Sequence, residues 1–413
     1  MSLAETIDPT QPATPQAREP ATSLGLADLA GRVFRREALD PLANDLQARA
    51  GEGDLGAALD LSWLLQLVGQ REQGLALQDD VLRLQTHFRT IHGDGSGLRL
   101  LALCAPGDTM ANTPVDFLLD GSNITLEQVF VGLDGSLPAT LPDHDVALVA
   151  IGESDRNTAV LQALNDARSA WPRPTLNRRT NGILAMRRDA AAELLGGEPS
   201  ILAPTTARAP REAVFAVAAG LGSVDDLLPG QDFPIIVRPV GSHAGGGLER
   251  IADAAALAEY LAGQPEIEAF YLAPFIDYRS ADGQFRKYRV AFVAGEPFLA
   301  HLAISQHWMV HYLNAGMVED AAKRMEEAQA MATFDDGFAA RHAEAFEALN
   351  DRFGLDYYGV DCAETPDGRL LVFEADNALI IHDMDPPDVF PYKSAVVRRL
   401  FTAFQQLLAR TAG

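Results

Sequence analysis

The chain has 413 residues, with 57 Asp and Glu against 33 Lys and Arg, and a formal net charge of −24 at pH 7. This length allows two or three domains, and the 47% hydrophobic content is ordinary for a globular protein. The negative charge opposes binding to nucleic acid or to an anionic membrane. We therefore expect neither partner, and expect any anionic ligand to be held in a local basic pocket.

The N-terminal residues and the two cysteines favour a cytoplasmic protein. Residues 1–24 are rich in Pro, Thr and Ala, which predicts a disordered tail rather than a signal peptide or an anchor. No later run is long and apolar enough to span a bilayer. Cys104 and Cys362 each lie in an apolar run, which predicts core packing and no disulfide framework.

Residues 25–95 are predicted to form a helical segment. Apolar residues recur at helical spacing over residues 55–68 and again over 75–84, and we expect the pattern to continue to about Phe88. The two stripes resemble one helical hairpin of the tetratricopeptide type, and a helical cap packed on the next domain is the alternative. A protein or peptide partner would bind at these helices.

The pattern then changes to short apolar runs separated by helices, which predicts an α/β fold. We expect one α/β domain over residues 96–200, with strands at 98–104, 145–151 and 175–177 and a helix at 158–170. A second is expected over 201–413. Its predicted strands are 234–238, 267–272, 288–293 and 297–303, and its predicted helices are 254–262, capped by Asp253, 323–331 and 336–353.

Two apolar runs near the C-terminus carry acids. Residues 356–361 and 370–377 flank Pro366-Asp367-Gly368, a turn signal that predicts a β-hairpin. Residues two apart share a strand face, so Glu374 and Asp376 are expected on one side, with Asp361 beside them. Grouped carboxylates suit Mg²⁺, and an exposed acidic edge is the alternative.

A glycine-rich loop follows an apolar strand that ends in Arg238. Glycines let backbone N–H groups approach phosphate oxygens, and a neighbouring Arg adds charge-assisted contacts. The loop is not a P-loop, because the Gly-Lys-Ser/Thr ending is absent. A flexible surface loop is the alternative. The loop residues expected at the phosphates are Gly241, Ser242, Gly245, Gly246 and Gly247.

Two further segments suit a nucleotide. Residues 270–276 are apolar and contain Pro274, which cannot continue a central strand and leaves backbone groups free beside an apolar wall, as a flat adenine ring needs. Farther on, Lys287 and Arg289 are two apart and share a strand face, so both cations are expected to point to one site. A solvated edge strand is the alternative.

In this order, the residues resemble the ATP-grasp superfamily, and within it glutathione synthetases and ribosomal-protein glutamate ligases. The resemblance covers roughly residues 98–404 and leaves the N-terminal helices outside. The spacing is its sharpest feature: Asp361 and Glu374 are 374 − 361 = 13 apart, and the third acid lies two beyond. The resemblance implies an ATP-grasp fold with a preceding Rossmann-like α/β domain.

The resemblance also implies cofactors and roles. ATP and two Mg²⁺ would be the cofactors, with Arg238 and Arg289 as catalytic residues. The implied nucleotide contacts are Arg188, Arg238, Gly241, Ser242, Gly245, Gly246, Gly247, Leu272, Ala273, Pro274, Phe275 and Lys287, and the implied metal ligands are Asp361, Glu374, Asp376 and Asn377, with the choice between the last two left to strand register.

The chain departs from the family pattern at four places. Arg238 stands where the family usually has Lys, and Arg187 or Arg188 stands for the Lys of the first lid strand. The third metal ligand is typically Asn, whereas this chain has Asp376 followed by Asn377. Ile304 replaces an Arg that relatives often place at the end of the next strand.

The implied activity is a carboxylate–amine ligase that phosphorylates an acid to an acyl phosphate, which an amine then attacks. The acid and amine substrates would be small molecules or peptides, and a homodimer would be in keeping with the family. One alternative is a ligase that crosslinks a precursor peptide recognised by the N-terminal helices. Another is an ATP-binding interaction protein with a degenerate active site.

Overall fold

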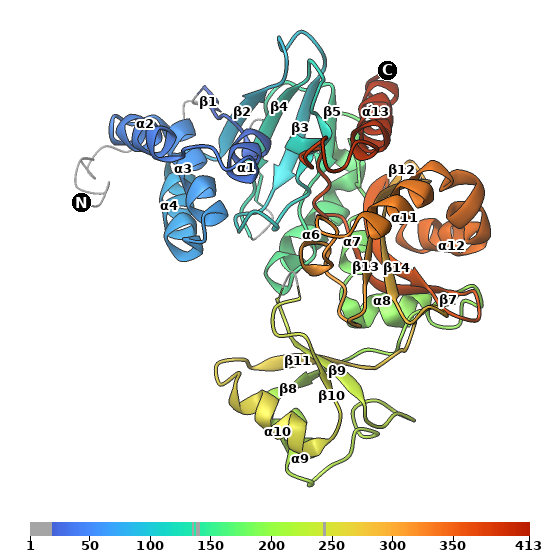
Figure 1. Cartoon of the computed structure of the whole chain (residues 1–413). Helices are drawn as coiled ribbons and strands as arrows, with labels where there is room; N and C mark the ends of the chain where they lie inside the picture. The colour runs from blue at the N-terminus through green and yellow to red at the C-terminus, as the bar shows by residue number, and fades with distance from the viewer. Residues whose placement is uncertain (1–18, 134–135, 138–140, 243–244) are drawn as a thin grey trace. The chain divides into compact units, whose positions relative to one another are not determined.

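The computed structural model describes residues 19–133, 136–137, 141–242 and 245–413 and contains both helices and strands (Figure 1). The mixed α/β fold predicted from the sequence is confirmed. The chain divides into two compact units. The first takes in the chain up to Thr180 with residues 377–386 and 397–413, and the second comprises residues 181–376 and 387–396. The finer division into four segments stays a prediction.

The first unit is built on one six-stranded sheet in the order β1-β2-β4-β3-β5-β6. Strand β3 runs parallel to both β4 and β5, and both of its faces are covered, as its nearly continuous apolar run predicts. Its strands are β1 (Ala21–Thr22), β2 (His87–Ile91), β3 (Arg99–Cys104), β4 (Thr125–Phe130), β5 (Val146–Val149) and β6 (Thr175–Leu176).

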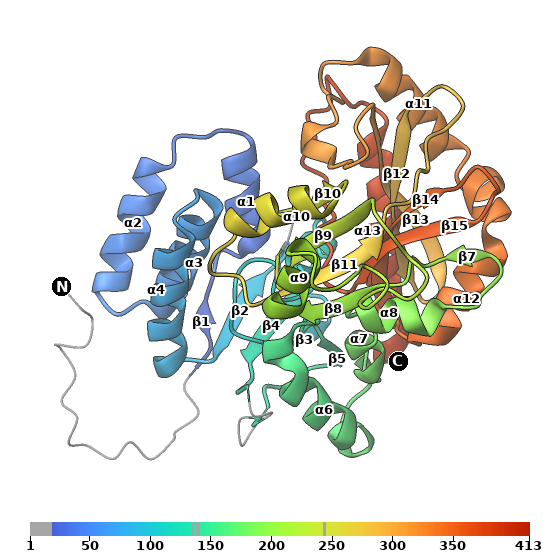
Figure 2. The same cartoon turned by 90° about the horizontal axis from the view of Figure 1, so that it is seen from below.

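Four N-terminal helices lie beside the β1–β2 edge of this sheet (Figures 1 and 2). Helices α3 and α4 pack closely because Gly74 has no side chain: a Cβ there would lie 2.5 Å from the Ser62 carbonyl oxygen. The helices of this unit are α1 (Leu26–Phe34), α2 (Asp40–Gly51), α3 (Leu55–Leu67), α4 (Arg71–Leu84), α5 (Val115–Leu118), α6 (Thr158–Ala167) and α13 (Lys393–Ala412), which starts in the second unit.

The N-terminal helical region ends earlier than the sequence predicts. Helices α3 and α4 occupy the predicted helical stripes, but the pattern does not continue to Phe88, because α4 ends at Leu84 and β2 begins at His87. The alternation of His87-Phe88-Arg89-Thr90-Ile91 gives a strand with Phe88 and Thr90 buried. Most of the predicted disordered tail lies outside the described residues, and its residues Ala21–Thr22 form β1.

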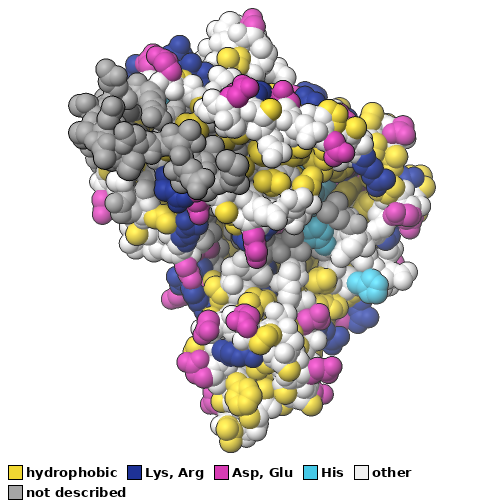
Figure 3. Space-filling view, turned by 90° about the vertical axis from the view of Figure 1, so that its left-hand side faces the viewer, with side chains coloured by type: hydrophobic (Ala, Val, Ile, Leu, Met, Phe, Trp, Pro, Cys, Tyr) yellow, Lys and Arg dark blue, Asp and Glu magenta, His cyan; other side chains and the backbone are white. Residues whose placement is uncertain are grey.

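The second unit contains a small antiparallel sheet, β10-β9-β11-β8, packed against α9 and α10. Asp253 caps α10 as predicted, accepting the Ala256 N–H at 2.9 Å. The elements are β8 (Ala207–Pro210), α9 (Arg211–Ala218), β9 (Ile235–Pro239), β10 (Glu249–Ile251), α10 (Ala254–Ala262) and β11 (Ala269–Pro274). Hydrophobic side chains are visible on the outside of this module at the bottom of Figure 3. Leu221, between α9 and β9, is 82% exposed.

The larger sheet of the second unit has the order β13-β12-β14-β15-β7. The hairpin predicted around Pro366-Asp367-Gly368 is present as β14 and β15, and Gly368 takes the positive φ of 84° that its turn requires. The remaining elements are α7 (Asn181–Leu184), α8 (Arg188–Leu195), β7 (Ile201–Leu202), β12 (Phe285–Val293), β13 (Glu296–Ser305), α11 (Ala321–Ala332), α12 (Ala343–Phe353), β14 (Tyr357–Glu364) and β15 (Leu370–Asp376).

Both cysteines are free and buried, as the sequence predicts. Burial raises the pKa of the Cys104 thiol to about 12 and that of Cys362 well above its usual value, so neither is a thiolate near neutral pH. None of the helices in the described part of the chain is both long enough and apolar enough to cross a membrane.

Candidate functional site

The acid hairpin lies beside the basic strand in the larger sheet. Strand register places Arg289 of β12 opposite Asp361 of β14, and Asp361 opposite Glu374 of β15. Both β12 and β14 have a register irregularity directly after these residues, and such bulges re-aim side chains beside functional sites. The sequence-predicted acids and cations therefore meet in one row across three strands.

Asp361 is held by two cations. Arg289 donates from Nε to Oδ1 at 2.8 Å and from Nη2 to Oδ2 at 3.0 Å, and Lys287 Nζ donates to Oδ2 at 2.9 Å. Asp361 is 1% exposed. Burial by itself would raise its pKa, but the charges of Arg289 and Lys287 outweigh burial and hold the pKa well below its ordinary value. The carboxylate is thus ionised, and both of its oxygens are in ion pairs with these two cations.

Glu374 pairs with Arg188, whose Nη1 also donates to the Phe373 carbonyl at 3.3 Å. Burial opposes ionisation of Glu374, but the charge of Arg188 outweighs it and lowers the pKa. Arg188 is the first residue of helix α8 and Arg187 is its N-cap, so neither lies on a lid strand as expected. The local sequence Arg188-Asp189-Ala190-Ala191-Ala192-Glu193-Leu194-Leu195 is rich in strong helix formers, which explains the difference.

Arg238 is a buried cation at the end of β9. It is 8% exposed, and its hydrogen bonds go to Ser242, with Nε and Nη2 donating to Ser242 Oγ at 3.2 and 3.1 Å. Burial, and then the like charge of Arg188, lowers the pKa of Arg238 to about 10. A desolvated guanidinium close to a second one favours an anion between or beside them.

The glycine loop follows Arg238 directly, as predicted. Gly241, Gly245 and Gly247 have φ of 77°, 76° and 66°, which only glycine adopts readily, and a Cβ on Gly247 would lie 2.8 Å from the Pro239 ring. Ser242 is fixed by its hydrogen bond to the Pro239 carbonyl at 2.9 Å. Phosphate binding by Gly241, Ser242 and Gly245 to Gly247 stays a prediction.

The predicted adenine segment lies at the end of β11. Strand β8 stops opposite Leu272, whereas β9 continues to pair as far as Pro274. Leu272 is 1% exposed, so its side chain is buried and only its backbone groups could contact a ligand. Phe275 packs edge-on to Trp308 with ring centroids 5.8 Å apart, and the Arg250 guanidinium lies 4.2 Å from its centroid. Ala273 to Phe275 therefore adjoin an aromatic and cationic wall.

The two candidates for the third metal ligand have different surroundings. Asp376 ends β15 and lies opposite Gly359 of β14, two residues from Glu374 and on the same face. The Asn377 amide Nδ2 instead donates to Ile151 O at 3.0 Å and Thr113 Oγ1 at 3.3 Å, and Asn377 is fully buried. Asp361, Glu374 and Asp376, with Asn377 as the alternative to Asp376, therefore stay predicted ligands.

These acids do not form a ready-made metal cage. Across the described residues, no three His, Cys, Asp or Glu side chains stand close enough together to hold a metal ion. The donor set still fits Mg²⁺, because the acids are oxygen donors and ionised Asp361 and Glu374 have opposite positions on adjacent strands. Lys287 pairs with Asp361 and Arg188 pairs with Glu374. A bound metal ion would contact the same carboxylates, either beside these cations or in their place.

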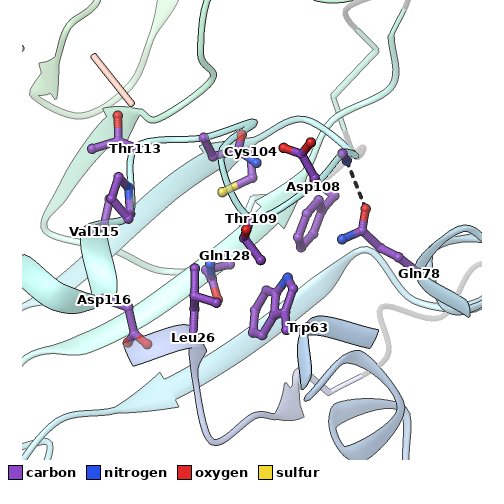
Figure 4. Close-up of a pocket in the computed structure, with 14 residues that line it drawn as sticks. Leu26, Trp63, Gln78, Cys104, Asp108, Thr109, Thr113, Val115, Asp116 and Gln128 are labelled. Carbon is purple, nitrogen blue, oxygen red and sulfur yellow. Dashed lines mark hydrogen bonds between the residues drawn. The ribbon is translucent and has the colours of Figure 1, made fainter. Parts of the chain in front are cut away.

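Sequence reasoning missed a second, smaller feature in the first unit. A cavity of about 40 Å³ lies where β3 and β4 end, and its lining includes Trp63, Gln78, Asp108 and Asp116 (Figure 4). One signal could have indicated it: the polar loop that starts at Gly107, shortly after the apolar strand β3 ends at Cys104. Ligands of parallel sheets bind at the carboxyl ends of strands.

Matches to this chain are found among solved structures. No family model matches this chain, and no curated protein is similar to it in sequence. A RimK domain ATP-grasp protein of Sphaerobacter thermophilus is 20% identical with a TM-score of 0.43, and the match covers 76% of this chain and 100% of that one.

Two ligases are also similar. D-alanine–D-alanine ligase of Bacillus anthracis, solved with ATP, is 14% identical with a TM-score of 0.45, over 76% of this chain and 97% of that one. The VanG D-Ala:D-Ser ligase of Enterococcus faecalis is 10% identical with a TM-score of 0.45, over 76% of this chain and 100% of that one. At such identities and scores, the similarity assigns no activity to this chain.

Proposed function

We propose that the protein is an ATP- and Mg²⁺-dependent carboxylate–amine ligase that forms an amide or peptide-like bond through an acyl phosphate. The observation that carries the proposal is the charged row formed by Arg289, Asp361 and Glu374, flanked by Lys287 and Arg188. Phosphoryl transfer needs little covalent chemistry from a protein. It needs positioning and neutralisation of spread negative charge, which is what such a row supplies.

Asp361, Glu374 and Asp376 would hold Mg²⁺. When bound, the metal neutralises phosphate charge and orients the transferring group. The chain's own cations also contribute neutralising charge. Arg289 and Lys287 are fixed against Asp361, so their geometry is set before a nucleotide binds. Such preorganised charges cost no rearrangement during the reaction.

Arg238 and the glycine loop would bind the phosphates. The guanidinium is buried and its hydrogen bonds go to the neighbouring Ser242, so its charge is available to a phosphate oxygen. Backbone N–H groups of Gly245 to Gly247 would cover the same oxygens and exclude water, which protects an acyl phosphate from hydrolysis. The backbone of Ala273 to Phe275 would meet the adenine ring.

The direct test supplies purified protein with ATP, Mg²⁺ and a panel of carboxylic acids, with hydroxylamine as a general nucleophile. An acyl phosphate reacts with hydroxylamine to a hydroxamate, so a ligase gives ADP and hydroxamate in equal amounts. Glu374→Gln should abolish both products. The matched control is Asp367→Asn, an exposed acid in the turn of the same hairpin, which should keep wild-type turnover. Full turnover in Glu374→Gln would contradict the site.

A second candidate is an ATP-binding protein without turnover. The observation that favours it is the pairing of Asp361 and Glu374 with Arg289, Lys287 and Arg188, which leaves the acids neutralised by the chain itself. ATP binding by calorimetry without ADP release across the whole panel of acids would select this candidate. A peptide-crosslinking ligase would instead give ADP only with a precursor peptide, which then loses the mass of water.

A further inference from the structure

Helix α10 is joined to the glycine loop by one side chain. Helix α10 lies beside β10 and α9 in the small module (Figure 2). Tyr260, in its last turn, donates from the hydroxyl to the Gly247 carbonyl at 2.7 Å. The Tyr260 ring packs edge-on to the buried Phe270 of β11, with centroids 5.8 Å apart. The side chain therefore connects the core of the module with the far end of the glycine loop.

The end of α10 that carries Tyr260 is firmly held. Leu257 and Leu261 of this helix are buried in the core of the module. Arg211 of α9 donates to the Leu261 carbonyl at 2.8 Å and to the Gln264 carbonyl at 2.6 Å. The last carbonyls of a helix have no partner within it, so these bonds fix the C-terminal end of α10 to α9.

The far end of the glycine loop is a turn with two free amides. The Leu248 N–H donates to the Gly245 carbonyl at 3.1 Å and closes the turn around Gly246 and Gly247. In the part of the chain that the structure describes, the N–H groups of Gly246 and Gly247 donate to no acceptor. Successive free amides in a turn form a concavity that binds anions, so this turn suits a phosphate group.

The hydrogen bond from Tyr260 restricts a backbone that would otherwise be free. Glycine has access to more of φ/ψ space than any other residue. The Gly247 carbonyl belongs to a planar peptide, so a bond to its oxygen fixes the orientation of that whole plane. From another side, the Pro239 ring lies 2.8 Å from the place of a Cβ on Gly247. Pro239 directly follows Arg238, so the turn is held beside the residue after the buried guanidinium.

The Tyr260 hydroxyl remains a neutral donor near neutral pH. Burial, and then the charge of Glu249, raises the pKa of Tyr260 to about 12. A neutral hydroxyl that is engaged with a carbonyl adds no charge to attract a phosphate. Its effect on a bound anion is therefore indirect and passes through the backbone of the turn.

We propose that Tyr260 is a positioning residue for phosphate binding, and that its hydrogen bond to the Gly247 carbonyl holds the free amides of Gly246 and Gly247 in the arrangement that a phosphate group binds. The identification of the ligand as a nucleotide rests on the proposed function. The effect of Tyr260 on the turn does not. Tyr260 thus strengthens the binding of ATP and has no effect on the binding of adenosine, which has no phosphate.

The test compares Tyr260→Phe with wild type, both as the full chain. In calorimetry with Mg²⁺, the variant should bind ATP about fivefold more weakly, because one positioning hydrogen bond is lost. In ligand-observed NMR, adenosine should bind both proteins equally. Tyr358→Phe is the matched control, since it removes a buried hydroxyl that donates to Asn350 Oδ1 at 2.8 Å, and it should leave both affinities unchanged.

Hydrogen exchange without nucleotide measures the turn itself. The Leu248 amide makes the hydrogen bond that closes the turn, and in Tyr260→Phe it should exchange about fivefold faster than in wild type. In Tyr358→Phe it should exchange at the wild-type rate. Thermal unfolding of each variant checks that it is folded.

The outcomes separate the role of Tyr260 from nucleotide binding as such. Unchanged ATP affinity in Tyr260→Phe, or an equal loss for ATP and adenosine, would overturn the positioning role. Unchanged exchange of the Leu248 amide would overturn it as well. If wild type binds no ATP and Tyr260→Phe still speeds exchange, the nucleotide proposal fails while the hold of Tyr260 on the turn is supported.

Discussion

Arg289 and Asp361 form a two-point ion pair across strands β12 and β14, with both contacts between 2.8 and 3.0 Å. The two residues are 72 positions apart in sequence, and the carboxylate is almost completely excluded from solvent. Such a pair fixes the strand register at the point where the proposed phosphoryl transfer takes place. Its contribution to the free energy of folding depends on this geometry, because the cost of burying two charges is offset only when they are well paired.

Removing one partner should therefore be costly. Arg289→Met leaves Asp361 buried with Lys287 as its remaining cation, and we expect the free energy of unfolding to fall by about 3 kcal/mol in urea titrations. Adding Asp361→Asn to this variant should recover part of the loss, because the buried charge disappears. The control is Arg369→Ala, which removes an exposed ion pair to Asp367 and should cost at most about 1 kcal/mol. Equal losses in both single variants would contradict the pairing.

Lys393 and Glu327 give a second prediction in the same unit. Glu327 is fully buried, and burial raises its pKa although Lys393 Nζ lies 3.4 Å away and Tyr392 donates a hydrogen bond at 2.6 Å. Lys393→Met should lower the free energy of unfolding by about 3 to 5 kcal/mol. The double variant with Glu327→Gln should lose less than the sum of the single variants, which a double-mutant cycle measures.

The control for this cycle is Lys323→Met on helix α11, the helix that carries Glu327. Lys323 Nζ donates to the Ala315 carbonyl and not to a buried carboxylate. Its loss should cost about 1 kcal/mol, the net value of one hydrogen bond. A cost for Lys323→Met as large as that for Lys393→Met would show that the buried carboxylate is not responsible.

Asp60 should make stability depend on pH. Burial raises its pKa to about 6, against an ordinary value of 3.8, although Ser23 Oγ donates to it at 2.6 Å. Between about pH 4 and 6, the folded protein therefore holds a proton that the unfolded chain has lost. The free energy of unfolding must fall as pH rises through this interval, by up to about 3 kcal/mol in all.

Urea unfolding at pH values from 4 to 7 measures this effect as the difference between wild type and Asp60→Asn. The Asn variant has no proton to lose, so the difference should change steadily from pH 4 to 6 and then level off. Asp45→Asn, an exposed acid on α2, should follow wild type at every pH. A constant difference between Asp60→Asn and wild type would show that Asp60 does not titrate in this range.

Local sequence signals predicted the elements that depend on neighbours in the chain. The Pro366-Asp367-Gly368 turn, the Asp253 cap and the loop after Arg238 are where their residues place them, because each is fixed within a few positions. Buried and exposed positions alternate from His87 to Ile91, which is typical of a strand. The helical pattern just before this segment is stronger, so the sequence predicted a helix as far as Phe88.

Long-range pairings could not be predicted in the same way. Arg188 meets Glu374 across 186 positions, and strand alternation alone does not show which cation lies opposite which acid. The family resemblance implied a lid strand for Arg187 or Arg188, whereas the contact of Arg188 with Glu374 is made from the start of a helix. For Trp63 and Gln78, the sequence likewise predicted only that they lie on helices. Their position beside the end of β3 depends on how these helices pack on the sheet.

Arg238 should affect nucleotide binding and stability in opposite directions. Within the described residues, no carboxylate lies within ion-pair distance of its guanidinium, and burial with the nearby Arg188 lowers its pKa to about 10. Such a charge is unfavourable in the free protein and becomes favourable when an anion binds. We expect Arg238→Gln to weaken ATP binding at least about tenfold in calorimetry, while the free energy of unfolding stays equal or increases. Arg369→Gln, which removes an exposed cation paired with Asp367 outside the proposed site, is the control and should leave ATP binding unchanged. If Arg238→Gln destabilises the fold and leaves ATP affinity unchanged, Arg238 is a structural residue and the phosphate site lies elsewhere.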